Sequence, residues 1–574
     1  MREVPTPLEA LQSFLKDKKL GGMILPREDR FQGAYLAPRD ERLAWATGFS
    51  GSAGCALILP NRAVLCVDGR YILAASRQGS SALEVTEEAP ERWLCRVQAE
   101  VEGPIGFDPW QVSLARLRRF QKASPSLTFQ PLLDNPVDLL WTTRPPFQEP
   151  AVFPYEEAFS GASASDKVQQ VLQKIGEVGA QAAFLTDSAS IAWLLNLRSD
   201  LPFLPAFPAY ALIQEGAPVC LFSDIASWPT QALFRTYALA EMREVLSNSS
   251  ASTLCIDPQE TPCGVCSLLK DLGKTVQEAH NPCQALKAIK NSVELQGFRD
   301  CHERDAIALI EFLAWLEKAA VSEPLNEQKA AERLQDFRAR DPWYRGPSFE
   351  TISATGAQAA FVHYQTPPTG GALLKAGDLY LVDSGGQYQN GSTDCTRTVA
   401  IASGQKPFTK EVYTAVLQGL IAATTTIFPE AVSGAALDAI ARRPLWSLGL
   451  AYAHGTGHGV GHYLGVHEHP PSLSASSSTP LEAGMVLSIE PGFYKPDAFG
   501  IRLENLVEVV PVPDKPGFLT FSTLTLVPFE KTLIASHQLT NGERAWLEAY
   551  HARIWETLHT RLSPEAQFWL KARL

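Results

Sequence analysis

Residues 454–469 read HGTGHGVGHYLGVHEH and hold five of the eleven histidines in the chain. Glycine lets the backbone approach a ligand closely and adopts dihedral angles that other residues avoid. Imidazoles set among glycines are therefore typical of a catalytic or metal-binding segment. Isolated surface or core histidines, the alternative interpretation, would not cluster at this density.

Four acidic residues lie in or beside apolar, strand-like runs outside this segment: Asp383, Asp394, Glu490 and Glu504. Carboxylates in buried strands are costly unless cations balance them, and Arg502 alone cannot balance four. Four carboxylates carry −4, which two divalent cations would neutralise, with one neutral imidazole as a further ligand. Oxygen-rich ligation without thiolate favours Mn²⁺, with Co²⁺, Fe²⁺ or Zn²⁺ as alternatives. A metal pair of this kind activates water and polarises a carbonyl group.

Asp383 and Asp394 are expected on the two arms of a β-hairpin. The Asn390-Gly391 dipeptide favours a two-residue turn. That turn would pair Gln387 with Asp394 and leave Asp383 roughly 13 Å away along the strand. A site shared by both acids would then require a bulge or a longer loop.

The first half of the chain contains one pattern used twice. A helix over 8–18 precedes strands over 22–25, 55–59 and 63–67, and a helix over 167–178 precedes strands over 182–185, 210–213 and 219–222. Alternating helices and short strands indicate α/β layers, so we expect an α/β (α+β) fold. Proline-rich linkers near residues 145 and 282 predict domains at 1–150, 151–288 and 289–574. A long helix over 292–320 opens the third, and a helical tail follows residue 541.

Composition excludes several other classes of protein. The 574 residues exceed the size of a single core, and the net charge of −12 argues against a nucleic-acid partner or an anionic membrane. The N-terminus lacks the apolar run of a signal peptide, no apolar stretch is long enough to span a membrane, and the sparse cysteines suit a reducing compartment, so we predict a cytoplasmic protein. Cys263 and Cys266 form a lone C-x-x-C pair whose role the sequence leaves open. HExxH, P-loop and G-x-S-x-G motifs are absent.

The series Asp383, Asp394, His458, Glu490 and Glu504 resembles the ligand pattern of the pita-bread metallopeptidases, which include methionine aminopeptidase, prolidase and aminopeptidase P. Within that family, further motifs resemble those of the cytosolic three-domain Xaa-Pro aminopeptidases. These are FVHY (361–364), VDSG (382–385), TDCTRT (393–398), HGTGHGVG (454–461), VHE (466–468), IEPG (489–492), DGRY (68–71) and IAWLLNLR (191–198). The resemblance spans nearly the whole chain. It implies two creatinase/prolidase-like N-terminal domains, then a pita-bread catalytic domain with a C-terminal extension.

The resemblance also implies a role for each matching residue. Asp383 would chelate one metal, His458 the second, Asp394 and Glu504 would bridge both, and Glu490 would complete the cage and accept the proton of the nucleophile. The predicted catalytic residues are His363, His454, His467 and Glu490, and the predicted substrate contacts are Arg70, His363, His458, His467 and Arg502. His469 departs from the pattern, in which a glycine follows the His-Glu pair.

These features predict a metallo-aminopeptidase that hydrolyses the N-terminal Xaa-Pro bond with two divalent metal ions, Mn²⁺ in first place. The bond is a tertiary amide to a rigid ring, which requires a dedicated pocket. The alternatives are a prolidase restricted to dipeptides and a non-catalytic pita-bread binding module, although such modules typically lack the ligands. The expected partners are peptides with proline second and, by resemblance, a second copy in a homodimer; neither nucleic acid nor membrane is expected.

Overall fold

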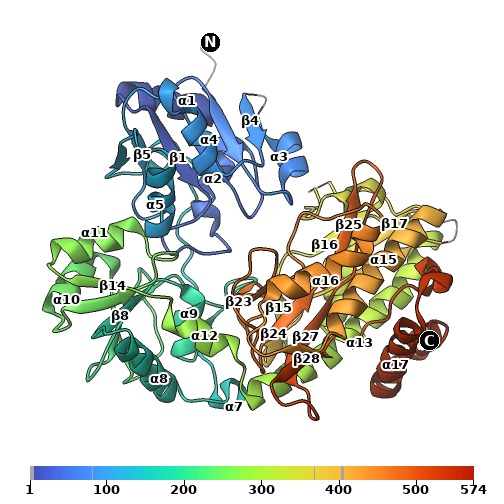
Figure 1. Cartoon of the computed structure of the whole chain (residues 1–574). Coiled ribbons are helices and arrows are strands. Elements are labelled where there is room, and N and C mark those ends of the chain that lie inside the picture. Colours follow the sequence, from blue (N-terminus) through green and yellow to red (C-terminus); the bar gives the residue numbers. More distant parts are fainter. Residues whose placement is uncertain (1–4, 81, 368, 403–405) are drawn as a thin grey trace. The chain divides into compact units, whose positions relative to one another are not determined.

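The computed structural model describes residues 5–80, 82–367, 369–402 and 406–574 (Figure 1). The chain divides into two compact units. The first comprises the chain up to Tyr155, Ala162–Leu201 and Ala206–Cys283. The second comprises Glu156–Gly161, Pro202–Pro205 and Gln284–Leu574.

Two six-stranded sheets with the same topology form the first unit. Their strand orders are β4-β3-β2-β1-β5-β6 and β12-β11-β10-β8-β13-β14. In both sheets the three strands that come first in the chain pair antiparallel, and the remaining strands add in parallel. The shared order and direction support the internal repeat that the sequence predicts. The strands are β1 (Gly22–Pro26), β2 (Cys55–Ile58), β3 (Ala63–Cys66), β4 (Leu83–Thr86), β5 (Ile105–Phe107), β6 (Phe129–Pro131), β8 (Ala182–Leu185), β10 (Tyr210–Gln214), β11 (Val219–Phe222), β12 (Phe234–Tyr237), β13 (Thr253–Ile256) and β14 (Thr275–Glu278).

Helices α1 (Pro7–Asp17) and α8 (Ala164–Glu177) open the two repeats, as predicted. Thr6 caps α1 through a capping box with Glu9, and the Ser163 side chain accepts a hydrogen bond from an amide in the first turn of α8. Each helix presents an apolar stripe to its sheet. Other helices of this unit are α2 (Arg42–Thr47), α3 (Ile72–Gln78), α4 (Pro90–Val97), α5 (Leu114–Ala123), α6 (Pro136–Leu140), α9 (Ser188–Leu194), α10 (Met242–Asn248) and α11 (Cys263–Asp271).

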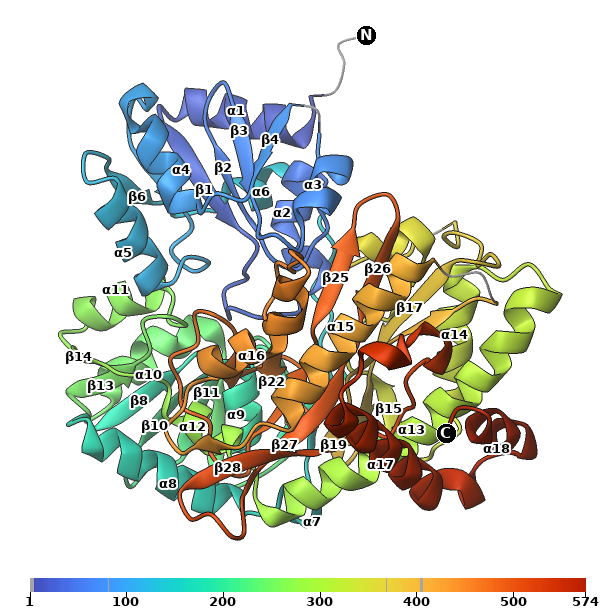
Figure 2. The same ribbon diagram turned by 45° about the vertical axis from the view of Figure 1, so that its right-hand side comes forward.

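The second unit packs long helices against antiparallel sheets (Figure 2). Asn291 caps α13 through a capping box with Glu294, and α13 runs for 31 residues. Buried apolar residues of α13 to α18 join those of the central strands in one core cluster. These helices are α13 (Ser292–Ser322), α14 (Glu327–Arg338), α15 (Pro407–Thr424), α16 (Gly434–Ser447), α17 (Asn541–Leu558) and α18 (Pro564–Lys571); the short α7 (Glu157–Ser160) and most of α12 (Pro282–Ala288) also belong to this unit.

The largest sheet of this unit has the order β21-β28-β27-β24-β22-β23, and smaller sheets are β16-β17-β20, β15-β18-β19 and β25-β26. The predicted mixed α/β fold class is therefore confirmed. The strands are β15 (Tyr344–Pro347), β16 (Ile352–Thr355), β17 (Leu379–Ser384), β18 (Gly386–Tyr388), β19 (Gly391–Ser392), β20 (Cys395–Ala400), β21 (Phe428–Pro429), β22 (Gly457–Gly459), β23 (Glu468–Leu473), β24 (Val486–Ile489), β25 (Gly492–Lys495), β26 (Phe499–Arg502), β27 (Asn505–Pro511) and β28 (Phe518–Thr523).

The predicted hairpin register between β17 and β20 is wrong. Gln387 pairs with Ser392 rather than with Asp394, and Tyr388 pairs with Gly391. The loop is thus Gln389-Asn390, one residue earlier than the Asn-Gly signal indicates. The same register continues to the pair between Asp383 and Thr396, so neither a bulge nor a longer loop is needed. With Asp394 two residues from Thr396, the two acids become diagonal neighbours across the ladder.

In the part of the chain that the structure describes, no helix is both long enough and apolar enough to cross a membrane.

Candidate metal centre

The predicted ligands lie at the ends of strands that backbone hydrogen bonds draw together. Asp383 lies in β17, and Asp394 directly precedes β20. Glu504 joins β26 to β27, and its amide donates to the carbonyl of Thr396 at 3.1 Å. Glu490 follows β24, and its amide donates at 2.7 Å to the carbonyl of Thr456, which lies two residues before His458. The strand network therefore brings four separate segments to one place.

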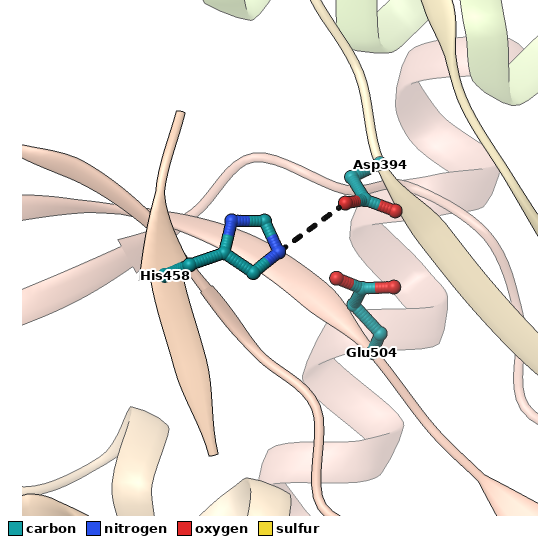
Figure 3. Close-up of side chains that lie close together, drawn as sticks. All are labelled: Asp394, His458 and Glu504. Carbon is teal, nitrogen blue, oxygen red and sulfur yellow. Dashed lines mark ion pairs between the residues drawn. The ribbon is translucent and has the colours of Figure 1, made fainter. Parts of the chain in front are cut away.

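Three of these residues meet closely enough to hold one ion. One ligand atom each from Asp394, His458 and Glu504 lies within 4.8 Å of the others (Figure 3). Nε2 of His458 is 3.5 Å from Oδ2 of Asp394 and 3.7 Å from Oε1 of Glu490. The geometry thus joins Glu490 to the same cluster.

The imidazole of His458 is oriented as a metal ligand. Its Nδ1 lies 2.9 Å from the carbonyl oxygen of Gly459, which can only accept a hydrogen bond. Nδ1 therefore carries the proton, and in the neutral ring Nε2 directs its lone pair at the carboxylates of Asp394 and Glu490. A backbone acceptor of this kind fixes the tautomer of metal-binding histidines.

The negative charge of the carboxylates in this cluster exceeds the positive charge that Arg502 brings to Asp383. Asp394 and Glu504 are 3% and 1% exposed, and their pKa values are raised well above the usual range, first by burial and then by neighbouring carboxylates. Within the described residues, no hydrogen-bond partner reaches Oδ1 of Asp383, Oδ1 of Asp394 or Oε1 of Glu504. Three buried, unsatisfied carboxylate oxygens, two of them on residues grouped with His458, fit a site for hard divalent cations.

A chain of hydrogen bonds leads outward from Asp383. Arg502 donates from Nη2 to Oδ2 of Asp383 at 2.6 Å and from Nη1 to the hydroxyl of Tyr494 at 2.7 Å. That hydroxyl lies 2.8 Å from Nε2 of His454, whose Nδ1 is 2.7 Å from the carbonyl of Gly455. Because the carbonyl accepts from Nδ1, Nε2 of a neutral His454 accepts a hydrogen bond from the Tyr494 hydroxyl. The donor and the acceptor of each hydrogen bond between Asp383, Arg502, Tyr494 and His454 are therefore defined.

Three predicted substrate contacts lie in different surroundings. The side chain of His467 is exposed, and its ring centroid is 4.4 Å from that of His458. His363 is half-buried in the loop after a short helix, Gly356–Ala360. Arg502 is 1% exposed, and its contacts with Asp383 and Tyr494 favour a supporting part over the predicted contact with substrate. Their predicted roles toward substrate stay predictions.

Arg70 belongs to the first unit and pairs with Asp68 at 2.7 Å. Its role toward substrate also stays a prediction.

Two residues of the centre escape a reading of the sequence. Tyr494 links His454 to Arg502, and the hydroxyl of Thr396 donates to Oε2 of Glu504 at 2.7 Å. Their proximity to proposed ligands is the one available signal: Tyr494 lies four residues after Glu490, and Thr396 two after Asp394. Burying a neutral hydroxyl costs far less than burying a carboxylate, so the sequence pattern does not single out these two residues as functional.

Family models match along the chain. Metallopeptidase family M24 matches residues 296–511, and the C-terminal region of peptidase M24 matches residues 517–573. The creatinase/prolidase N-terminal domain matches twice, at 7–138 and 143–294. The probable Xaa-Pro aminopeptidase P of Laccaria bicolor is 36% identical over 606 residues, covering 98% of this chain and 92% of the relative. That of Coccidioides posadasii is 37% identical, covering 96% and 95%.

The chain therefore belongs to metallopeptidase family M24, the class of enzyme that the fold and the acid-rich centre indicate. These relatives, which match it over nearly their whole length, are named Xaa-Pro aminopeptidase P. A solved X-prolyl aminopeptidase from Caenorhabditis elegans, described as a cytosolic enzyme with a di-nuclear active site, has a TM-score of 0.91 at 32% identity and covers 99% of this chain and 98% of that one. A prolidase from Pyrococcus horikoshii shares the fold at 24% identity and a TM-score of 0.52, covering 64% of this chain and 99% of the prolidase.

Proposed function

We propose that this protein is a Xaa-Pro aminopeptidase that removes the first residue of peptides whose second residue is proline. The observation that carries the proposal is the convergence of Asp394, His458, Glu490 and Glu504 in a centre with unsatisfied carboxylate oxygens. Relatives named for this activity match the chain over almost its whole length, and this supports the proposed substrate class.

Two divalent metal ions complete the proposed centre. Asp383, Asp394, His458, Glu490 and Glu504 would hold them, with Asp394 and Glu504 shared between the two ions. We propose Mn²⁺ because carboxylate oxygens dominate the donor set and no thiolate takes part; Co²⁺, Fe²⁺ and Zn²⁺ are the alternatives to test. Such ions, when bound, polarise the peptide carbonyl and lower the pKa of a water molecule.

Glu490 is the proposed proton acceptor for the attacking water. Its side chain is 19% exposed, compared with 5% for Asp394 and 12% for Asp383. The carboxylate of Glu490 is thus the most accessible of these three while its Oε1 remains 3.7 Å from Nε2 of His458. A base must reach the proton that it removes, and a partly accessible carboxylate beside a buried charge cluster meets that need.

His467 and His363 are the proposed contacts to the substrate around the scissile bond. The accessible ring of His467 beside His458 supports the first assignment. A neutral imidazole there can donate to the carbonyl oxygen as negative charge develops on it. His454 has both ring nitrogens engaged with Gly455 and Tyr494, so we propose that it orients the Tyr494 hydroxyl toward Arg502. Arg502 in turn holds Asp383.

The remaining proposals concern organisation. We propose domains at 1–150, 151–288 and 289–574, with Arg70 of the first domain reaching the peptide beyond proline. We further propose a homodimer in the cytoplasm; the cytosolic description of the Caenorhabditis elegans enzyme supports the compartment. Sedimentation equilibrium and cell fractionation test these two statements.

A peptide panel tests the proposed function. The Mn²⁺-loaded protein is incubated with Arg-Pro-Pro, Arg-Pro and Arg-Ala-Pro, and mass spectrometry follows the products. We expect rapid release of arginine from Arg-Pro-Pro, slower cleavage of Arg-Pro and none of Arg-Ala-Pro. Faster cleavage of Arg-Pro would identify a prolidase, and equal cleavage before alanine would remove proline from the account.

A further inference from the structure

A buried carboxylate with two lysines lies directly beside the exposed His467. Glu468, at the start of β23, forms ion pairs with Lys287 at 3.1 Å and with Lys290 at short range. All three side chains are at most 4% exposed. No step of the proposed reaction uses this cluster, which we call the Glu468 triad.

The triad is anchored to the strand that leads to the metal centre. Lys290 also donates from Nζ to the carbonyl of Lys287 at 2.6 Å, and its backbone amide donates to Gly484 at 2.9 Å. Ile289, between the two lysines, forms a β-bridge with Met485, the residue before β24. Since β24 leads directly to Glu490, the lysines are fixed relative to the proposed ligands.

Glu468 links the fixed lysines to two histidines: it follows His467 in the chain, and its backbone pairs with Gly459 next to His458. Because Glu468 directly follows His467, fixing the backbone of Glu468 fixes the point from which the His467 side chain extends. The backbone of Glu468 pairs with Gly459, the neighbour of His458. Gly459 allows this approach, because a Cβ there would lie 2.6 Å from the carbonyl oxygen of Glu468. In this arrangement the ring centroids of His467 and His458 are 4.4 Å apart.

Stability alone gives a weak reason for such a cluster. Moving charges out of water is costly, and apolar replacements of buried ion pairs are often no less stable. A geometric role is better supported, because Glu468 directly follows His467 in the chain and its backbone pairs with Gly459, the neighbour of His458.

We propose that Glu468, held by Lys287 and Lys290, is a positioning residue that keeps His467 beside His458 at the scissile carbonyl. This inference rests on the proposed function, in which His467 contacts the substrate. The triad acts only through His467 and takes no proton in the reaction.

A double-mutant cycle tests the proposal in the Mn²⁺-loaded full chain. Glu468→Gln should lower kcat about tenfold with little change in KM, and about twofold or less when His467 is already alanine. Metal content should stay at the wild-type value in both backgrounds. An equal loss of kcat in both backgrounds would overturn the proposal, since the effect would then not pass through His467.

Two further variants separate positioning from general destabilisation. Lys287→Met leaves a neutral Glu468–Lys290 pair and should fold; we expect a smaller loss of kcat, again only when His467 is present. Glu508→Gln is the matched control, because Glu508 is 5% exposed, lies in β27 and pairs with Arg299 at 2.7 Å. It should lower the melting temperature without lowering kcat. A loss of kcat in the control equal to that of Glu468→Gln would also overturn the proposal.

A crystal structure of the Glu468→Gln variant gives a readout that does not depend on activity. We expect the His467 ring to leave its position beside His458 while the five proposed ligands stay in place. An unmoved, well-ordered His467 would contradict the proposal. If the wild-type protein failed to cleave Xaa-Pro peptides, the proposed function would fall, and the structure would still test the positioning of His467.

Discussion

Arg502 donates a 2.6 Å hydrogen bond to Oδ2 of Asp383, while Oδ1 of the same carboxylate has no partner among the described residues. One oxygen is thus neutralised by a buried guanidinium, and the other remains available to a metal ion. A planar guanidinium can hold Asp383 and Tyr494 at once, as two different nitrogens do here. Asp383 is therefore oriented before any ion binds.

The Tyr494 hydroxyl should matter to catalysis although it is not a proposed ligand. Tyr494→Phe removes the acceptor for Arg502 and the donor to His454, so we expect kcat to fall about tenfold with metal content unchanged. Steady-state kinetics and elemental analysis measure both. The control is Tyr380→Phe. Tyr380 lies in β17, and its buried hydroxyl is hydrogen-bonded to the hydroxyl of Ser353 in β16 at 2.7 Å. Equal kinetic losses in the two variants would contradict the hydrogen-bond chain.

His458 should be indispensable for metal binding. His458→Ala removes the only imidazole nitrogen proposed as a ligand, and we expect metal content to fall to about one ion per chain or less with a loss of activity above about a hundredfold. Inductively coupled plasma mass spectrometry gives the metal content. His537→Ala, at an exposed position, serves as control. Retention of the wild-type metal content by His458→Ala would exclude the proposed ligand set.

The metal-free protein should lose stability as the pH rises above neutrality. Burial and mutual repulsion raise the pKa values of Asp394 and Glu504, so the folded state binds more protons than the unfolded state. The free energy of unfolding then falls as pH rises from the unfolded values toward the raised folded ones. Melting temperatures of chelated wild type and of Asp394→Asn/Glu504→Gln should converge at low pH and diverge at high pH, with wild type less stable.

The pH comparison should begin above pH 6.5. Burial lowers the pKa values of His302 and His551 to about 4, and neutral buried histidines add stability as pH rises up to their ordinary value of 6.5. Above that value their contribution is constant, so the carboxylates decide the slope. Saturating Mn²⁺ should stabilise wild type most at high pH, because the ions bind the deprotonated acids. Identical pH slopes for both chelated proteins would contradict the assignment.

Cys263 and Cys266 should be inert and unrelated to metal. Both lie in α11 of the first unit, and burial raises their thiol pKa values to about 12 and about 11. Thiolate is the reactive and metal-binding form, so little is present near neutral pH. Replacement of both by alanine should leave metal content and activity unchanged. A loss of bound metal in that variant would show that the pair holds an ion.

Sequence patterns were sufficient where one local signal decides the structure. The helical patterns over 8–18 and 292–320 predict helices that the structure forms as α1 and α13. The acids of the centre were visible because an uncompensated charge in an apolar strand is costly. Their uncompensated charge predicts that these acids share a metal site, but the distances between them depend on strand pairing that the sequence does not show.

Relationships between distant segments escaped prediction. The Asn390-Gly391 signal competes with two flanking strand ladders, and the ladder that pairs Asp383 with Thr396 fixes the register. Lys290 and Glu468 are 178 residues apart, and nothing in either local pattern marks their ion pair. The sequence does not mark Tyr494 either, because a hydroxyl has no charge and its partners, His454 and Arg502, lie in other segments of the chain.

Anomalous diffraction at the manganese edge from crystals of the Mn²⁺-loaded protein tests the central claim most directly. We predict two peaks, both bridged by Asp394 and Glu504, one also bound by Asp383 and the other by Nε2 of His458 and by Glu490. Ligand distances should be about 2.0–2.3 Å. A fully loaded crystal with no peak among these residues, or with one ion that leaves Asp383 or His458 without a metal contact, would contradict the account.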